Sequence, residues 1–465
     1  MKYVDYKELT GVVITQDNFS YEEDRKSWNR AIDKYPLAIV YCKNNEQVGN
    51  AIIWARQNLL EIRIRSGRHH YEGYSTGDDV VVIDVSKMNK ISVDEEKNIV
   101  KIQGGVRNRE LYDTLNNLGY PFPGGGCPTV GVPGLVLGGG WGYSSRLFGL
   151  ACDSLIEAEI VDFKGNIIIT SEKVNNDLFW ALKGAGGGNF GIVTSMTFRL
   201  PKKIEMATLI DIDCLEARDE EIIKAYEVWE NLFKDLDRRI NLKMGIYNSL
   251  KKGPGVRITG VFYGTKEEAK SILVSFKTIT KKEIFKLEYL TVLEVNRIIQ
   301  DSHPPYEKYK SSGRFVYNDY TRYEIEKIIE LVKERAEGAV YTAVSFYGLG
   351  GAVNDKDKKE SAFYYRDAKF IMGFQSVWEE SKYAQENIEW VKKKQRHINE
   401  ITTGSYVSFP CAELEDYERE YYGENYYRLR EIKRKYDSEN VFNFPQSINN
   451  VELKIAMKKN IKQID

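Results

Sequence analysis

Compact apolar runs alternate with amphipathic segments along the first third of the chain. Residues 37–41 and 80–85 are almost wholly apolar, which is typical of buried strands. Residues 46–58 instead carry apolar side chains at helical spacing, which predicts an amphipathic helix with Asn45 as its N-cap. The members of this apolar face are Val48, Ala51, Ile52 and Ala55. The alternation predicts a lobe that mixes strands and helices.

Further signals in this region lead into glycine-rich loops. Residues 61–65 and 99–103 predict strands, and residues 110–118 predict a helix. Residues 156–162 and 166–170 are expected to form a hairpin across Lys164-Gly165. Because 61–65 and 110–118 are each followed by glycines, the two loops after them lie at the ends of ordered elements.

Beyond residue 200 the pattern changes to long amphipathic segments. Helices are predicted at 220–233, 266–278, 322–337 and 382–401, and the strands between them include 257–263 and 339–347. This composition predicts an α+β lobe in which helices cover an antiparallel sheet. After Gly404, a helix at 425–435 and a tail at 441–448 indicate a return to the first lobe. We therefore divide the chain into 1–203, 204–403 and 404–465.

Composition narrows the class of function. The 465 residues include 67 basic and 68 acidic side chains, and this balance argues against a nucleic-acid partner. Five scattered cysteines without CxxC spacing and only four histidines argue against a disulfide framework or a metal site. No apolar run reaches ~18 residues, so no membrane span is expected. Residues 1–5 do not show the pattern with which a signal peptide begins. This favours a cytoplasmic location and leaves a coat or surface location open. The oligomeric state is not determined by the sequence.

Two loops hold the residues with the most reactive side chains. The first, 65–73, reads Arg-Ser-Gly-Arg-His-His-Tyr-Glu-Gly. Successive backbone N–H groups and the guanidinium charges of Arg65 and Arg68 suit a pyrophosphate. The second, 124–132, reads Gly-Gly-Gly-Cys-Pro-Thr-Val-Gly-Val. A lone cysteine is usually a small core residue, but glycines on both sides leave Cys127 open to a ligand.

With a third segment, these loops resemble a known family. Residues 177–193 read Asp-Leu-Phe-Trp-Ala-Leu-Lys-Gly-Ala-Gly-Gly-Gly-Asn-Phe-Gly-Ile-Val, and Gln446-Ser447-Ile448 lies near the C-terminus. Together the motifs resemble the berberine bridge enzyme-like flavoproteins, which have the PCMH-type FAD-binding domain of the vanillyl-alcohol oxidase group. The resemblance implies a two-lobed α+β fold. The N- and C-terminal segments would form the FAD-binding lobe, and the central segment would form the substrate pocket.

The resemblance also implies which residues hold the cofactor. His69 would bond the flavin 8α-methyl and Cys127 would bond flavin C6. His70 is a rival attachment site by adjacency, although the motif frame assigns His69; the family more often has glycine at position 68 and serine at position 70. The other cofactor-binding residues implied are Arg65, Ser66, Gly67, Arg68, Val130, Gly131, Gly134, Gly138, Gly139, Gly142, Gly188, Gly191, Ile192 and Val193.

The resemblance also links two further positions to the reaction: one to the access of O2 to the flavin and one to the catalytic base. Val130 corresponds to a small residue that leaves the flavin accessible to O2 in plant members, which favours an oxidase that produces H2O2. Phe409 occupies the position of the family's usual tyrosine base and cannot move a proton. Tyr71 is the first substitute, Tyr347 the second and Tyr406 a weaker third. The expected function is oxidation of an alcohol group in a small molecule such as a sugar; the alternatives are a dehydrogenase with another acceptor and a catalytically silent, flavin-loaded structural protein.

Overall fold

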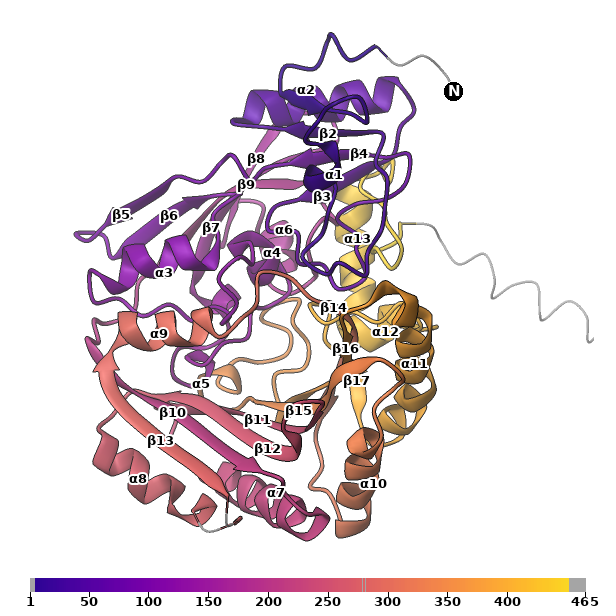
Figure 1. Ribbon diagram of the computed structural model, residues 1–465. Coiled ribbons are helices and arrows are strands. Elements are labelled where there is room, and N and C mark those ends of the chain that lie inside the picture. Colours follow the sequence, from indigo (N-terminus) through magenta and orange to yellow (C-terminus); the bar gives the residue numbers. More distant parts are fainter. Residues whose placement is uncertain (1–4, 278, 281, 451–465) are drawn as a thin grey trace, which may run out of the picture.

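The computed structural model describes residues 5–277, 279–280 and 282–450. Within these residues the strands form sheets of four, five and eight strands. Figure 1 shows the two smaller sheets in an upper lobe and the eight-stranded sheet in a lower lobe. The C-terminal helix α13 (Tyr426–Tyr436) lies beside the upper lobe in that view. None of the helices in the described part of the chain combines the length and apolar character needed to cross a bilayer.

The first sheet carries the histidine loop at one edge. Its order is β1 (Val12–Ile14), β2 (Ala38–Tyr41), β4 (Val81–Asp84) and β3 (Ile62–Arg65). β2, β4 and β3 are parallel because helix α2 (Asn45–Gln57) crosses over from β2 to β3. The side chain of Asn44 caps α2 by accepting from Gln47 N, so the N-cap lies one residue before the predicted Asn45. The 65–73 loop begins where β3 ends.

The second sheet is antiparallel and supports the cysteine loop. Its strand order, from edge to edge, is β5 (Ile91–Asp94), β6 (Ile99–Gln103), β9 (Ile192–Arg199), β7 (Leu155–Val161) and β8 (Ile167–Ser171). β7 and β8 form the predicted hairpin. The short helices of this lobe are α1 (Tyr21–Asp24), α3 (Asn108–Asn116), α4 (Val132–Leu137), α5 (Ser145–Phe148) and α6 (Asn176–Ala181). The cysteine loop runs between α3 and α4.

The eight-stranded sheet of the central lobe has antiparallel pairings throughout its described strands. Its order is β13 (Glu283–Thr291), β10 (Met206–Leu215), β12 (Gly253–Phe262), β11 (Ile240–Ser249), β15 (Ala339–Gly348), β16 (Phe370–Trp378), β14 (Lys308–Val316) and β17 (Thr403–Ser405). One face packs its apolar side chains against helices, which are α7 (Asp219–Lys234), α8 (Lys266–Leu273), α10 (Arg322–Lys333) and α11 (Ala384–Glu400). The opposite face turns toward the upper lobe.

The central helices agree with the sequence expectation to within a few residues at most ends. The helix predicted at 266–278 ends earlier, at Leu273, and Thr278 lies outside the described residues. The pattern did not single out α9 (Val292–Asp301) or α12 (Tyr417–Tyr422). The C-terminal segment does return to the first lobe, because Tyr422 Oη donates to Ala185 O at 2.9 Å and Lys433 Nζ donates to Asn189 O at 2.6 Å.

Candidate functional site

The histidine and cysteine loops touch backbone to backbone. A Cβ added to Gly67 would lie 2.1 Å from Gly131 N, and one added to Gly131 would lie 2.5 Å from Ser66 Oγ. Only glycine fits both positions, since real Cβ atoms do not approach other atoms so closely. This close packing brings together two segments that are separated by about sixty residues in the chain.

His69 and Cys127 lie on either side of one hydroxyl group. His69 Nε2 is 2.8 Å from Thr129 Oγ1, and Cys127 Sγ is 3.9 Å from the same oxygen. Burial lowers the pKa of His69 to about 3, with Arg107 and His303 adding to the effect, so its imidazole is neutral at neutral pH. Burial also raises the pKa of the Cys127 thiol. The two residues singled out by sequence thus share one site, and Thr129 between them was missed.

His70 lies in a different environment from His69. Its Nδ1 accepts from Glu72 N at 3.3 Å, and its ring packs against Tyr74 with centroids 4.7 Å apart. The His69 ring instead stacks on Trp28 at 5.0 Å. Burial lowers the pKa of His70 to about 4, so it too is neutral. Since only His69 adjoins the cysteine loop through Thr129, the geometry agrees with the frame that assigns His69.

The guanidinium groups of the histidine loop have protein partners already. Arg65 Nε donates to Asp84 Oδ2 at 2.5 Å, and both side chains are almost fully buried. Arg68 donates to Tyr41 Oη at 2.6 Å. Arg68 Nε is buried and has no hydrogen-bond partner among the described residues, so a role of these charges in binding a pyrophosphate stays a prediction. Arg68 has φ +66°, a left-handed conformation that suits the glycine more usual at this position.

The predicted glycines fall into two groups. Some make tight packing contacts: an added Cβ would lie 2.0 Å from Ser408 Oγ at Gly138 and 1.9 Å from Gly124 O at Gly142. The others are less crowded: an added Cβ at Gly134 meets nothing within 4 Å, and one at Gly188 makes ordinary van der Waals contacts with the Phe444 and Ile64 side chains, the nearest at 3.4 Å. Gly139 and Gly191 belong to the packed group, and Ile192 and Val193 are buried in β9.

Several groups around the two loops are of the kind that bind a large polar cofactor. Buried polar atoms in or near the histidine loop that have no hydrogen-bond partner among the described residues include Trp28 Nε1, Arg68 Nε, Ser75 Oγ and Thr76 Oγ1. Less crowded glycines, orphaned hydrogen-bonding groups and a neutral imidazole next to a thiol fit the donor set expected for FAD. The described residues contain no group of three or more histidine, cysteine or acidic side chains arranged to bind a metal ion.

Aromatic side chains form the wall of the site next to Phe409. The Tyr71 and Phe409 rings are stacked at 5.1 Å with an interplanar angle of 6°, and Tyr347 contacts Phe409 at 5.4 Å. Burial and neighbouring tyrosines raise the pKa of Tyr71 well above its usual value. Tyr406 Oη accepts from Gly140 N at 3.2 Å, so its hydroxyl supports the glycine loop. Of the predicted tyrosines, Tyr71 and Tyr347 therefore both contact the Phe409 ring, as does Tyr406 with centroids 5.0 Å apart.

Lys243 adds a charge that the sequence analysis did not find. It lies opposite Tyr347 in the register of β11 and β15, with Nζ 4.8 Å from the centre of the Tyr347 ring. Burial lowers the pKa of its ammonium, but Tyr347, Tyr143 and Tyr341 raise it to a value above the usual one. No acidic side chain among the described residues forms an ion pair with it. The sequence feature that could have indicated this lysine is the alternation in β11, where Lys243 lies between the core residues Leu242 and Met244.

Comparisons with known proteins agree with this geometry. The family model described as FAD binding domain matches residues 36–171, and the model described as berberine and berberine like matches residues 405–449. The chain is 36% identical to the uncharacterized FAD-linked oxidoreductase YvdP of Bacillus subtilis over 452 residues, covering 95% of this chain and 98% of that protein.

Solved structures share the fold over nearly the whole chain. Physcomitrella patens BBE-like 1 is 25% identical, covers 96% of this chain and 98% of its own, and has a TM-score of 0.87. The glucooligosaccharide oxidase of Acremonium strictum is 23% identical, covers 95% of this chain and 97% of its own, and has a TM-score of 0.86. That oxidase is described as carrying 6-S-cysteinyl, 8α-N1-histidyl FAD.

Proposed function

We propose an oxidase function for this chain, which belongs to the berberine bridge enzyme-like family of FAD-linked oxidoreductases. The chain would hold FAD covalently on His69 and Cys127 and oxidise a hydroxyl-bearing carbon of a sugar or secondary metabolite. The observation that carries the proposal is the shared contact of His69 Nε2 and Cys127 Sγ with Thr129 Oγ1, at 2.8 and 3.9 Å. Two nucleophiles of different kinds lie on one side of the space that the cofactor would occupy.

The protonation states of these residues support a tether at both. A neutral His69 has a free lone pair, and Thr129 sets which ring nitrogen carries it. When Thr129 Oγ1 accepts the proton of Nε2, Nδ1 is left unprotonated as the nucleophile. The same hydroxyl can then donate to Cys127 Sγ, which stabilises the thiolate that a carbon–sulfur bond requires. The described linkage through N1 of the histidine in the glucooligosaccharide oxidase is compatible with this tautomer.

Tyr347 is the base that we propose in place of the usual tyrosine. Bound FAD would accept hydride from the substrate carbon. The accompanying hydroxyl proton needs an acceptor, and Phe409 cannot provide one. Tyr347 contacts the Phe409 ring and has Lys243 Nζ 4.8 Å from its own ring, so a tyrosinate there is stabilised by a neighbouring positive charge. Tyr71 has no comparable cation, and its raised pKa makes it the weaker candidate.

Molecular oxygen is the electron acceptor that we propose, with H2O2 as product. Val130 follows Thr129 directly and is only partly buried, and its carbonyl accepts from Asn108 N at 3.0 Å. That hydrogen bond fixes the backbone, so the size of the side chain at position 130 controls the free space there. A valine leaves more space than a leucine would.

An anaerobic screen tests the proposal. Sugars and secondary alcohols are added to the purified yellow protein without O2, and bleaching of the flavin absorbance identifies a substrate. Air is then admitted. Rapid return of the colour with production of H2O2 supports an oxidase, whereas slow return favours a dehydrogenase with another acceptor. Absence of bleaching with every compound would favour the silent structural protein.

A further inference from the structure

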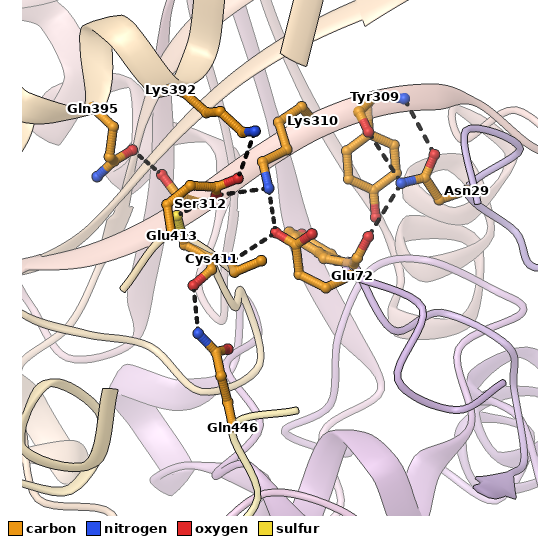
Figure 2. Close-up of polar contacts among 12 residues, drawn as sticks. Asn29, Glu72, Tyr309, Lys310, Ser312, Lys392, Gln395, Cys411, Glu413 and Gln446 are labelled. Atoms are coloured by element: carbon orange, nitrogen blue, oxygen red, sulfur yellow. Dashed lines mark hydrogen bonds and ion pairs between the residues drawn. The ribbon is translucent and has the colours of Figure 1, made fainter. Parts of the chain in front are cut away.

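A buried lysine on β14 joins the three segments that surround the site. Lys310 Nζ lies 2.6 Å from Glu72 Oε1 and 2.8 Å from Glu413 Oε2 (Figure 2). Glu72 belongs to the histidine loop, and Glu413 belongs to the C-terminal segment that also carries Phe409. The side chains of Lys310 and Glu72 are only 9% and 12% exposed, so the interaction is shielded from solvent. A single ammonium group therefore connects the upper lobe, the central sheet and the returning segment.

Each of these charges adjoins, or lies close in sequence to, an aromatic residue of the site. Tyr71 precedes Glu72, Tyr309 precedes Lys310, and Phe409 lies four residues before Glu413. Tyr309 and Lys310 are neighbours on β14, so their side chains point to opposite sides of the strand. Lys310 meets Glu72 and Glu413, while the Tyr71 ring lies 5.1 Å from the rings of both Tyr309 and Phe409.

Asn29 fixes the backbone between the two sides. Its Nδ2 donates to Tyr71 O at 3.2 Å and to Tyr309 O at 3.0 Å, while its Oδ1 accepts from Tyr309 N at 3.2 Å. Ala412 N also donates to Glu72 Oε1 at 3.1 Å. Figure 2 shows Asn29 and Lys310 acting on the same stretch of β14. The histidine loop is therefore held to β14 by side-chain hydrogen bonds and by ion pairs at consecutive residues.

The rings form a continuous series from the proposed attachment histidine to the proposed base. Successive members have ring centroids 5.0 to 6.0 Å apart, in the order His69, Trp28, Tyr309, Tyr71, Phe409 and Tyr347. The third, fourth and fifth members of the series, Tyr309, Tyr71 and Phe409, precede Lys310, Glu72 and Glu413 in the sequence. A shift of these three charged residues would therefore change the position of His69 relative to Tyr347.

We propose that Lys310 is a positioning residue, which places the histidine loop and the stacked rings of Tyr71, Tyr309 and Phe409 for attachment of the flavin. Attachment would replace a C–H bond of the flavin by the bond to His69 or Cys127; the two electrons released would reduce the flavin itself, and O2 would reoxidise it to give H2O2. The inference rests on the proposed function, because it assumes that FAD binds beside His69. Burial lowers the pKa of Lys310, but Glu72 and Glu413 raise it above the usual value, so the ammonium keeps its charge. Loss of that charge would leave the buried Glu72 carboxylate without its cation, while Glu413 would keep Lys392 at 3.5 Å.

The test compares Lys310→Met with Lys310→Arg and with Lys308→Met. Lys308 lies two residues earlier on the same strand and donates to Glu379 O and Ser381 Oγ, away from Glu72 and Glu413. Full-length protein is made under riboflavin limitation, FAD is added, and flavin that survives acid precipitation is followed in time. Lys310→Met should slow attachment by ~10-fold or more, since misplacement of reacting groups is costly. Lys310→Arg and Lys308→Met should stay within about twofold of the wild type.

Visible circular dichroism of the bound flavin separates positioning from a purely structural role. Lys310→Met should change this spectrum while the far-ultraviolet spectrum stays native. Native attachment rate and native visible spectrum in a folded Lys310→Met protein would overturn the proposal. If Lys310→Met does not fold, Glu72→Gln provides the test, because this variant keeps the Lys310–Glu413 pair. An unchanged visible spectrum and an unchanged attachment rate in Glu72→Gln would also overturn the proposal. A wild type that releases all FAD on denaturation refutes the tether, and the visible spectra of the variants still test the positioning role.

Discussion

Replacing Lys243 with methionine tests whether this lysine activates Tyr347. The substitution keeps the length of the side chain and removes its charge. With Nζ 4.8 Å from the Tyr347 ring centre and an effective dielectric constant of about 20, the lost attraction for a tyrosinate is about 3.5 kcal/mol. A barrier raised by that amount slows the chemical step on the order of 10²-fold. Tyr347→Phe, which removes the base itself, should slow it ~10²–10⁴-fold.

The assay is stopped-flow reduction of the flavin without O2, with a substrate from the bleaching screen. Lys252→Met is the matched control, because Lys252 pairs with Asp213 at 3.0 Å and is half exposed. Reduction near the wild-type rate in Lys243→Met would refute the reasoning.

Three further predictions concern the loops. Acid-precipitated wild-type protein should stay yellow, and peptide masses should locate flavin on His69 in Cys127→Ala and on Cys127 in His69→Ala; an effect of His70→Ala alone would move the attachment site to His70. Val130→Leu should slow reoxidation by O2 much more than reduction by substrate, and equal effects on the two half-reactions would limit residue 130 to packing. Arg68→Ala should be less stable than Arg68→Gly by about 1 kcal/mol in urea unfolding, because both lose the hydrogen bond to Tyr41 Oη but only alanine keeps the strain of φ +66°; equal stabilities would mean that the backbone relaxes at this position.

The sequence was most informative where a local pattern determines the structure. The apolar face of α2 and the alternation in β15 depend on neighbours within the same segment, so both elements were predicted close to their observed bounds. Helix α9 was missed although Thr291 and Glu294 form a capping box at its start. That signal was present in the sequence and was not used. Gly67 and Gly131 were expected beside a ligand, and in the structure both allow the close approach of the two loops to each other.

The pattern of apolar and polar residues could not predict contacts between segments that are distant in the sequence. Arg65 and Asp84 are Cα partners on the parallel strands β3 and β4. This register pairs the Arg65 guanidinium, which the motif suggested as a phosphate ligand, with the Asp84 carboxylate. The contact between Thr129 and His69 depends on the packing of the 65–73 loop on the 124–132 loop. Lys243 and Tyr347 are a hundred residues apart and meet through the pairing of β11 with β15. Periodicity within one strand carries no information about such a partner.

The position of Phe409 supports the proposal that the acid–base group comes from the central sheet. Phe409 O accepts from Gly313 N at 3.0 Å, and an added Cβ at Gly313 would lie 2.6 Å from Phe409 Cβ, so this backbone is fixed against β14. A ring held there contacts both Tyr71 and Tyr347 but contributes no hydroxyl. Of these two tyrosines, only Tyr347 lies on a strand whose neighbour supplies a cation. In the proposed function, the acid–base role would therefore fall to Tyr347, which contacts Phe409 and has Lys243 beside it.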